Sequence, residues 1–176
     1  MSEPRVAGPR VLVVDDEETI RLAIGRYLER RGYAVTAAPD AAAALDLLSA
    51  APAGHYALML CDVRMPGMSG VELVPRARAA DPLLAVLMLS AVDDAASARA
   101  AFTAGAVDYL IKPLELTALL AAVEEALRRR ALDLARRDAE HALRDDLAAQ
   151  RAKTQQQIDR YGRVVPVSSL GLVVRF

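Results

Sequence analysis

The stretch Val11-Leu-Val-Val-Asp-Asp-Glu17 puts two carboxylates directly after a short run of consecutive apolar residues. Further short apolar runs follow along the chain, each about the length of an ordinary strand: residues 33–36, 58–61, 84–89 and 107–111. Because the apolar residues are consecutive rather than alternating with polar ones, we expect strands that are buried on both faces of a sheet. The opening stretch therefore predicts a buried strand that ends in acidic side chains.

Segments with helical spacing separate these strands: residues 19–30, 41–49, 69–80, 93–104 and 115 onwards. Gly32 suits the position just after the first helix, and Gly105 ends the fourth. Asp40 and Ser69 can cap the second and third helices, and Pro75 is expected to kink or shorten the third. Strands alternating with helices predict an α/β fold, a doubly wound five-stranded parallel sheet with helices on both faces.

The stretch from residue 115 to about residue 161 contains neither Gly nor Pro and is dense in helix-forming residues. Acid-first pairs with i,i+4 spacing also favour a helix: Glu124 with Arg128, Glu125 with Arg129, Asp133 with Arg137, and Glu140 with Arg144. We expect one long C-terminal helix of about 45 residues, or about 68 Å, of which only the start packs on the sheet. Residues 162–176 are expected to form a flexible tail, or else to add a strand to a partner's sheet.

The composition of the 176 residues, 54% hydrophobic and 26% charged, is typical of a folded, helix-rich protein. The net charge is −1, so we expect neither direct nucleic-acid binding nor membrane association. The N-terminal residues lack the apolar run of a signal peptide, and a single cysteine fits a reducing compartment, which together predict a cytoplasmic protein. We expect Cys61 to be a small buried hydrophobe, and His55 and His141 to lie at the surface.

The predicted strands end in polar side chains that could act together: Asp15 and Asp16, Asp62, Ser90 and Lys112. In an open parallel sheet the carboxyl ends of the strands meet at one edge, where the ligand binds. Three carboxylates repel one another unless a cation joins them, and oxygen-only ligands with few protein contributions suit Mg²⁺. A lysine and a hydroxyl nearby supply the positive charge and the hydrogen-bond donor that a phosphoryl group needs. Taken singly, Asp15 and Asp16 could merely cap the next helix; their conjunction with the other groups favours a site.

Four stretches carry a resemblance to a known family: residues 11–17 above, Leu60-Cys-Asp-Val-Arg-Met-Pro-Gly-Met-Ser-Gly70, Leu87-Met-Leu-Ser-Ala91 and Gly105-Ala-Val-Asp-Tyr-Leu-Ile-Lys-Pro113. In this order and spacing they resemble the response-regulator receiver domain of two-component signalling. The resemblance covers about residues 9–128 and implies a flavodoxin-like receiver fold controlled by phosphorylation. Residues 129–161 would then be a helical extension, and residues 162–176 a tail.

The resemblance implies roles for the acidic residues. Asp62 would accept a phosphoryl group from a sensor histidine kinase or a phosphotransfer protein. Asp16 would bind Mg²⁺ directly and Asp15 largely through water, while Asp62 and the backbone carbonyl of Arg64 would complete the protein ligands. Such a protein is not an enzyme acting on a separate substrate, since it only assists its own phosphorylation and dephosphorylation.

The resemblance also implies a switch. Ser90 would hold the phosphoryl group through its hydroxyl, Lys112 would pair with it, and Tyr109 would move inward together with Ser90. The Lys112–Pro113 peptide bond is expected to be cis. Arg64 and Val92 would flank the phosphorylation site and alter the access of water to it.

The sequence allows more than one output for such a switch. We expect signalling by protein–protein contact; the alternatives are the receiver part of a larger effector, enzymatic or DNA-binding, and a structural adaptor that no longer responds to phosphate. Leu120, Leu127 and Leu134 repeat every seven residues, which predicts a coiled coil over the first part of the long helix. An isolated helix would leave Leu132, Leu134, Leu143 and Leu147 in water. We therefore expect the helix to pair with a second copy, as a homodimer, or with an unknown output protein.

Overall fold

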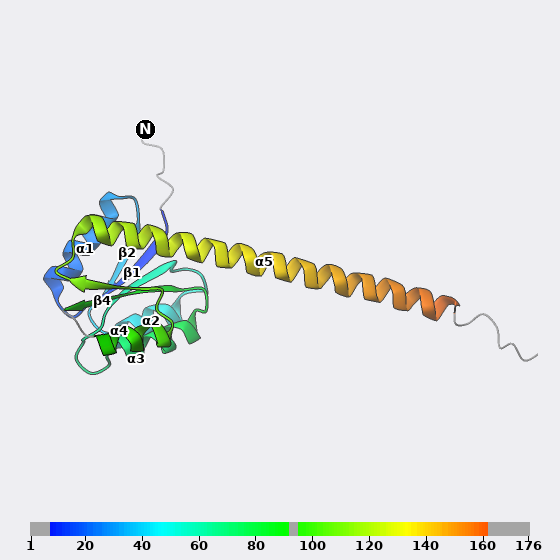
Figure 1. Ribbon diagram of the computed structural model, residues 1–176, viewed down its shortest axis with the longest axis horizontal. Coiled ribbons are helices and arrows are strands. Elements are labelled where there is room, and N and C mark those ends of the chain that lie inside the picture. Colours follow the sequence, from blue (N-terminus) through cyan, green and yellow to red (C-terminus); the bar gives the residue numbers. More distant parts are fainter. Residues whose placement is uncertain (1–7, 92–94, 162–176) are drawn as a thin grey trace, which may run out of the picture. The chain divides into compact units, whose positions relative to one another are not determined.

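The computed structural model describes residues 8–91 and 95–161. Val92, expected to flank the site, and the expected tail at residues 162–176 lie outside the described residues. The helices and strands follow one another in strict alternation (Figure 1): β1 (Arg10–Val14), α1 (Glu18–Arg30), β2 (Ala34–Ala38), α2 (Ala41–Ala50), β3 (Leu58–Asp62), α3 (Gly70–Ala80), β4 (Ala85–Ala91), α4 (Ala95–Ala104), β5 (Asp108–Lys112) and α5 (Leu116–Tyr161).

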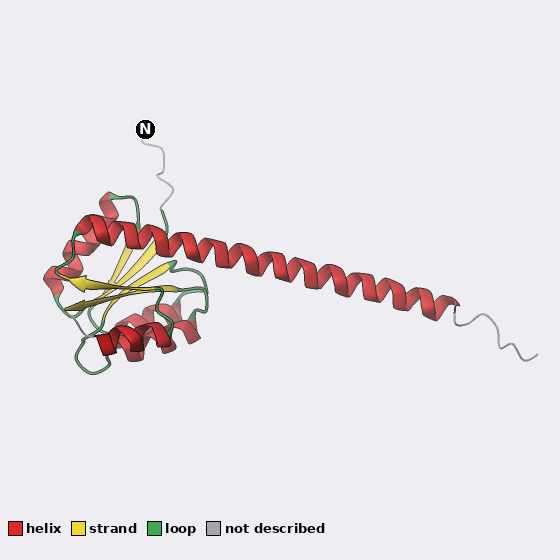
Figure 2. Cartoon of the chain, viewed as in Figure 1, coloured by secondary structure: helices red, strands yellow, loops and turns green. Residues whose placement is uncertain are grey.

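The strands form one parallel sheet in the order β2-β1-β3-β4-β5. Helices α2, α3 and α4 cover one face, and α1 and the first turns of α5 cover the other (Figure 2). Residues 58–62 of the central strand β3 are buried throughout, whereas the edge strands β2 and β5 are mostly half-buried. The predicted doubly wound five-stranded sheet is therefore confirmed, and burial on both faces explains the consecutive apolar residues.

Local signals in the sequence mark the starts of two helices and the end of a third where expected. The side chain of Asp40 accepts a hydrogen bond from the Ala43 N–H at 2.8 Å and caps α2. Ser69 caps α3 through a capping box with Glu72. Gly32 follows α1 with φ +94°, a conformation that favours glycine.

Pro75 lies inside α3 without shortening it, since the helix runs from Gly70 to Ala80. The expectation that proline would reduce this helix to a turn is wrong. Leu73, Val74 and Ala77 of the same helix are fully buried in the core, and the packing of this face outweighs the hydrogen bond that proline cannot donate.

Packing divides the chain into two units, Met1–Leu134 and Ala135–Phe176. In the first unit, α5 buries Leu119, Ala122, Val123 and Ala126 in the core. Of the predicted i,i+4 ion pairs, the described part of the helix forms the one between Glu125 and Arg129, at 2.7 Å. Arg128 also turns to Glu125, at 2.8 Å, and the two arginines lower the pKa of this carboxyl to about 2.

The remaining expectations concern single residues and membrane crossing. Cys61 is fully buried, as expected, and burial raises the pKa of its thiol. His141 is exposed, but His55 is half-buried, because its ring stacks edge-on against Tyr56 and its Nε2 lies 3.2 Å from Nη1 of Arg10. No helix in the described ranges is both long and apolar enough to cross a bilayer.

Candidate functional site

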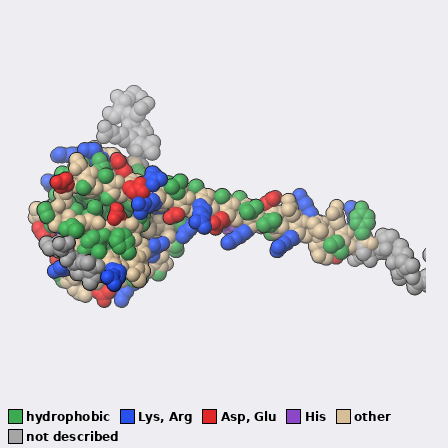
Figure 3. All heavy atoms as spheres, viewed as in Figure 1, with side chains coloured by type: hydrophobic (Ala, Val, Ile, Leu, Met, Phe, Trp, Pro, Cys, Tyr) green, Lys and Arg blue, Asp and Glu red, His purple; other side chains and the backbone are tan. Residues whose placement is uncertain are grey.

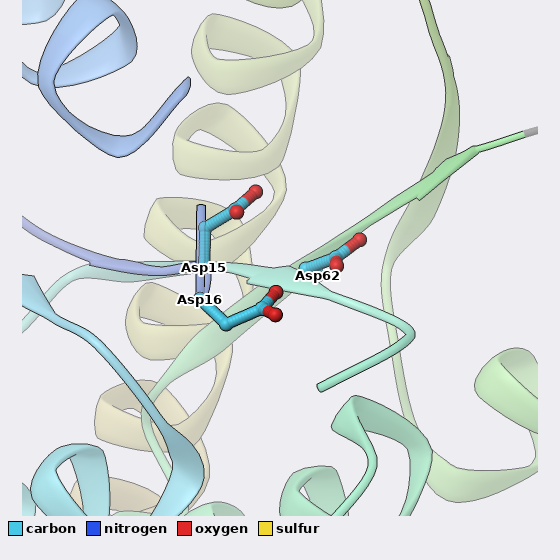
Figure 4. Close-up of side chains that lie close together, drawn as sticks. All are labelled: Asp15, Asp16 and Asp62. Carbon is cyan, nitrogen blue, oxygen red and sulfur yellow. The ribbon is translucent and has the colours of Figure 1, made fainter. Parts of the chain in front are cut away.

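Three carboxylates meet at the carboxyl edge of the sheet. Strands β1 and β3 are adjacent and parallel, with Val14 opposite Cys61, so the residues that follow these two lie next to each other. Oxygens of Asp15, Asp16 and Asp62 all lie within 4.8 Å of one another (Figure 4). The sequence predicted this cluster from the position of each acid at a strand end, and the geometry confirms the proximity.

The three acids differ in their surroundings. Asp15 is fully buried, Asp62 is 7% exposed and Asp16 is exposed. One oxygen of Asp15 accepts the N–H of Glu17, the N-cap residue of α1, at 2.9 Å, and this bond shapes the turn before the helix; within the described part of the chain, no side-chain capping bond is formed at the start of α1. Among the hydrogen bonds and ion pairs of the described residues, none involves the Asp16 carboxylate. Of the three acids, Asp16 is therefore the one whose carboxylate oxygens are both unengaged by the described residues and exposed to solvent, so that they can bind a ligand.

Lys112 reaches this cluster from the end of β5. Its Nζ donates to Oδ2 of Asp15 at 2.7 Å and lies 3.3 Å from Oδ1 of Asp62. The lysine side chain is 14% exposed, so the pairs are shielded from solvent. The Lys112–Pro113 peptide bond is cis, as expected. One lysine against three carboxylates leaves an excess of negative charge at the site, which suits a cation with oxygen ligands.

The pKa values reflect this balance of charges. Burial raises the pKa of Asp62; the charges of Asp15 and Asp16 also raise it, and Lys112 opposes them. For Lys112, burial alone would lower the pKa, but the hydrogen bond to Asp15 and the charge of Asp62 outweigh burial and raise it. The lysine is thus held in its charged form beside the carboxylate that it contacts.

Two hydroxyls near this edge lack partners among the described residues. Ser90 lies in β4 and is 1% exposed, one residue after the partner of Asp62 in the sheet, and its Oγ makes no hydrogen bond there. The hydroxyl of Tyr109, in β5, is also buried without a partner. Buried hydroxyls normally make a hydrogen bond, so both are ready to take one up when a ligand arrives or a neighbour moves.

The site is open to solvent on the side of Asp16. This residue lines a pocket of about 400 Å³, together with residues of the loops before α2 and α3: Pro39, Asp40, Pro66, Gly67 and Met68. Arg64, whose carbonyl is expected to bind metal, belongs to the same loop after β3 and has an exposed side chain. Of the three clustered acids, only Asp16 lines this pocket.

Gly70 is a residue of the site to which the sequence alone assigned no role. It is the first residue of α3, and its N–H donates to the carbonyl of Val63 at 2.9 Å. A Cβ at this position would collide with the backbone oxygen of Asp62 and would lie 2.9 Å from Sγ of Cys61. The absence of a side chain therefore lets α3 approach the end of β3. The glycine was visible in the quoted motif, but only the packing shows what it does.

We expect Gly70→Ala to weaken both stability and the site. The backbone of Asp62 must shift to admit the methyl group, and forcing extra volume into a packed core costs about 1–3 kcal/mol. Thermal unfolding and phosphorylation of the folded fraction would measure the two effects. Gly25→Ala in α1 is the control for a general effect of glycine loss, because its φ is not positive and a Cβ there would make only an ordinary contact, 3.7 Å from Val35. Wild-type stability and labelling of Gly70→Ala would contradict the close-approach argument.

Comparison with known proteins places this geometry in context. The family described as response regulator receiver domain matches residues 11–124. The chain is 40% identical over 118 residues to the uncharacterized transcriptional regulatory protein YkoG of Bacillus subtilis, covering 67% of this chain and 50% of that protein. It is 34% identical over 126 residues to a cyclic di-GMP phosphodiesterase of Thermotoga maritima, covering 72% of this chain and 33% of that protein. The chain thus spans about half the length, or less, of these relatives.

A similar solved structure is a response regulator protein from Burkholderia pseudomallei with a phosphorylated aspartic acid, a calcium ion and citrate. It is 32% identical to this chain, with a TM-score of 0.61, and the match covers 71% of this chain and 72% of that one.

Proposed function

Because the chain belongs to the response regulator receiver domain family, we propose that it is a phosphorylation-dependent response regulator whose phosphoacceptor is Asp62. The observation that carries the proposal is the contact of Lys112 with both Asp15 and Asp62 inside a cluster of three carboxylates. The phosphorylated aspartic acid and the bound metal ion of the related Burkholderia protein support it. The phosphoryl donor would be a sensor histidine kinase or a phosphotransfer protein of the cell interior.

The proposed reaction is a phosphoryl transfer. An oxygen of Asp62 attacks phosphorus, the P–O bond of an acyl phosphate forms, and the P–N bond of the donor phosphohistidine breaks, with its electron pair going to the imidazole nitrogen. Lys112 lies beside the attacking carboxylate and is positioned to pair with the phosphoryl oxygens. Ser90 is buried one residue beyond the sheet partner of Asp62, and its hydroxyl is available to donate to the same group.

Mg²⁺ is the proposed metal cofactor. The donor set consists of oxygens only, and the carboxylates outnumber the lysine, which fits a hard divalent cation. Asp16, Asp62 and the carbonyl of Arg64 would hold the ion directly, and Asp15, which is already engaged by Lys112 and Glu17, would act through water. When bound, the ion neutralises the charge that accumulates between the acceptor and the phosphoryl group.

The signal would pass to the surface through hydroxyl and charge movements. Once Asp62 is phosphorylated, Ser90 and Lys112 would bind the phosphoryl oxygens. The buried hydroxyl of Tyr109 makes no hydrogen bond among the described residues, so the Tyr109 side chain could move together with Ser90. The readout proposed is contact with an output protein, rather than direct contact with nucleic acid or a membrane. The relatives are longer than this chain, and one is named as a phosphodiesterase, so a receiver acting within a larger effector is the second candidate. Pairing of α5 with a partner helix is the proposed route of assembly.

Transfer from kinases tests the proposal directly. A panel of histidine kinases, autophosphorylated with labelled ATP, should include members that transfer label to this chain within minutes, in a form stable to acid and lost in base. Kinases lacking their phosphorylated histidine are the control for label carried over with ATP. If neither the kinases nor a small acyl phosphate labels the folded chain in the presence of Mg²⁺, the chain is not a phosphoacceptor.

We expect Lys112→Ala to separate phosphorylation from its consequences. Without its charge, the loops around the site lose the group that joins Asp15, Asp62 and the phosphoryl oxygens, so the phosphorylated variant should gain little affinity for its partner. The measurement is partner binding by the unphosphorylated and phosphorylated forms, with Arg26→Ala on the exposed side of α1 as the control for loss of a positive charge. A phosphorylation response of wild-type size in Lys112→Ala would reduce the lysine to a local charge.

A further inference from the structure

The second unit of the chain carries a stripe of large apolar side chains along one side of a helix whose other residues are alanine, polar or charged. Within Ala135–Tyr161, the strongly exposed large apolar side chains are Leu143 at 60%, Leu147 at 46%, Ile158 at 57% and Tyr161 at 71% exposure. Apolar side chains stand among the charged ones along this helix (Figure 3). Leucines exposed to this degree are unusual in a cluster on a free helix, because water disfavours them and a partner surface would cover them.

Positions on the side of the helix that bears these side chains recur every 11 residues, although of the four only Leu147 and Ile158 stand 11 apart. Ile158 stands 11 residues after Leu147, Thr154 stands 11 after Leu143, and Ala139, Gln150 and Tyr161 form a third series with the same spacing. At about 100° of rotation per residue, the four exposed apolar side chains fall within an arc of roughly 60°. A period of 11 corresponds to about 3.67 residues per turn, close to that of a straight helix, so the stripe stays on one side of the helix along its whole length.

The stripe differs from the heptad of Leu120, Leu127 and Leu134 that the sequence suggests. Leu127 packs against the core of the first unit, and Leu134 is half-buried, so the expectation that Leu134 lies in water is wrong. By helical rotation, Leu134 and Leu143 point to roughly opposite sides. Within the seven-residue series, Leu127 is thus engaged by the receiver core, whereas the large apolar side chains of the 11-residue series in the second unit are all exposed.

We propose that the stripe of Ala139, Leu143, Leu147, Gln150, Thr154, Ile158 and Tyr161 is the seam of a parallel coiled coil with a second copy of this chain. The proposal rests on the helix pairing put forward above and names its partner, register and direction. A long straight stripe can contact another helix over its whole length. The same stripe on a second copy of the chain has the same spacing, so it matches the first at every layer.

Charges beside the stripe favour the parallel direction. Arg151 lies on one flank and Asp146 on the other, five residues earlier. In a parallel pair the opposite flanks of the two helices meet, which brings Arg151 next to Asp146 of the second copy. In an antiparallel pair like flanks meet, so Arg151 would share its side with the arginines and Glu140 of that flank of the second copy, and its pairing with Asp146 would be lost.

Polar residues inside the stripe favour like-with-like register. In a parallel pair in register, Gln150 meets Gln150 of the second copy, and an amide can both donate to and accept from another amide. Thr154 meets its own counterpart one layer further on. A polar layer in an apolar seam lowers the stability of a coiled coil, but it selects the register and the number of helices. Any shift of one helix along the other would leave the polar groups unpaired. The stripe is thus built to select a partner of identical sequence.

Cysteine cross-linking of the full chain tests register and direction together. Thr154→Cys places a thiol at the centre of the seam, opposite itself in a parallel pair, and the native Cys61 is buried and does not compete. Mild oxidation should link most of this variant into covalent dimers. Ala148→Cys, on the far side of the helix, is the matched control and should remain uncoupled. Equal linkage of both variants, or none of Thr154→Cys, would overturn the parallel seam.

Sedimentation of the full chain tests whether a second copy is the occupant. The wild type should show an apparent mass that rises from one chain to two with concentration. Leu143→Glu with Leu147→Glu should raise the dissociation constant by roughly tenfold or more, equivalent to about 1.4 kcal/mol or more, while Ala148→Glu with Ala152→Glu should not. A wild type that stays monomeric at every concentration, or that pairs only with a different protein, overturns the proposal.

The phosphorylation assay keeps this result separate from the function proposed for Asp62. The stripe variants change only exposed residues of the second unit, so they should be phosphorylated like the wild type. If the chain dimerises but is not phosphorylated, the proposed seam stands and the proposed role of Asp62 is refuted. If it is phosphorylated but does not dimerise, the role of Asp62 stands and the seam is refuted.

Discussion

Asp62→Asn is expected to lose phosphorylation almost completely, by about 10²-fold or more, because an amide oxygen is a poor nucleophile and cannot form a stable acyl phosphate. Asp15 cannot substitute, since it is fully buried and held by Lys112 and the Glu17 N–H. Asp16 is exposed within the same cluster, so any residual label should map to it. The measurement is the initial rate of labelling from a phosphoryl donor with Mg²⁺, followed by mapping of the labelled peptide.

Loss of label in Asp62→Asn should not reflect unfolding. The pKa of Asp62 is raised in the folded protein, so its ionisation costs stability in full above the folded pKa, and this cost shrinks as pH falls from the folded to the unfolded pKa. At neutral pH and without Mg²⁺ the variant should therefore unfold at the same or a higher temperature than the wild type. Asp40→Asn is the matched control, because asparagine caps a helix as well as aspartate and Asp40 lies outside the cluster. Labelling of Asp62→Asn at the wild-type rate would refute the assignment of the acceptor.

Removal of Mg²⁺ is expected to be almost as damaging as loss of the acceptor. Excess chelator should slow labelling by about 10²-fold or more, since three carboxylates and one lysine leave the site too negative for a phosphoryl dianion to approach. Restoring Mg²⁺ should recover the rate, and the Mg²⁺ dependence of that recovery measures the affinity. Full labelling in chelator would show that Lys112 alone supplies enough positive charge.

The two acids of β1 should differ in their effect on the metal. Asp16→Asn should weaken Mg²⁺ binding more than Asp15→Asn, because Asp16 is exposed and makes no contact among the described residues, whereas Asp15 is occupied by Lys112 and Glu17. Thermal unfolding with increasing Mg²⁺ offers a second readout, since an ion that binds only the folded state raises its stability. If Asp15→Asn has the larger effect on affinity, the order of the two ligands is reversed.

Much of the fold could be predicted because its signals are local. Runs such as Val11 to Val14 are apolar at every position since both faces of their strands are covered, and that pattern is visible without any knowledge of the neighbours. Asp40 and Ser69 act through hydrogen bonds to residues three positions away, so their capping roles were also readable. Of the two effects expected of Pro75, the shortening of α3 does not occur, because the burial of Leu73 and Val74, a tertiary effect, decides the length of the helix.

The sequence by itself determined the alternation of strands and helices and the position of Asp15, Asp16, Asp62, Ser90 and Lys112 at strand ends, because connectivity in a parallel sheet brings those ends to one edge. Only the tertiary structure decided which of these groups touch. The strand order β1-β3-β4-β5 sets the reach of Lys112 to Asp15 and Asp62, and the approach of α3 to β3 requires glycine at position 70. Likewise, tertiary packing buries part of Leu127 in the first unit, whereas Leu143 and Leu147 in the second unit are exposed, as are all its described residues. The local helical pattern is the same for these leucines, so it does not show where packing on a core ends.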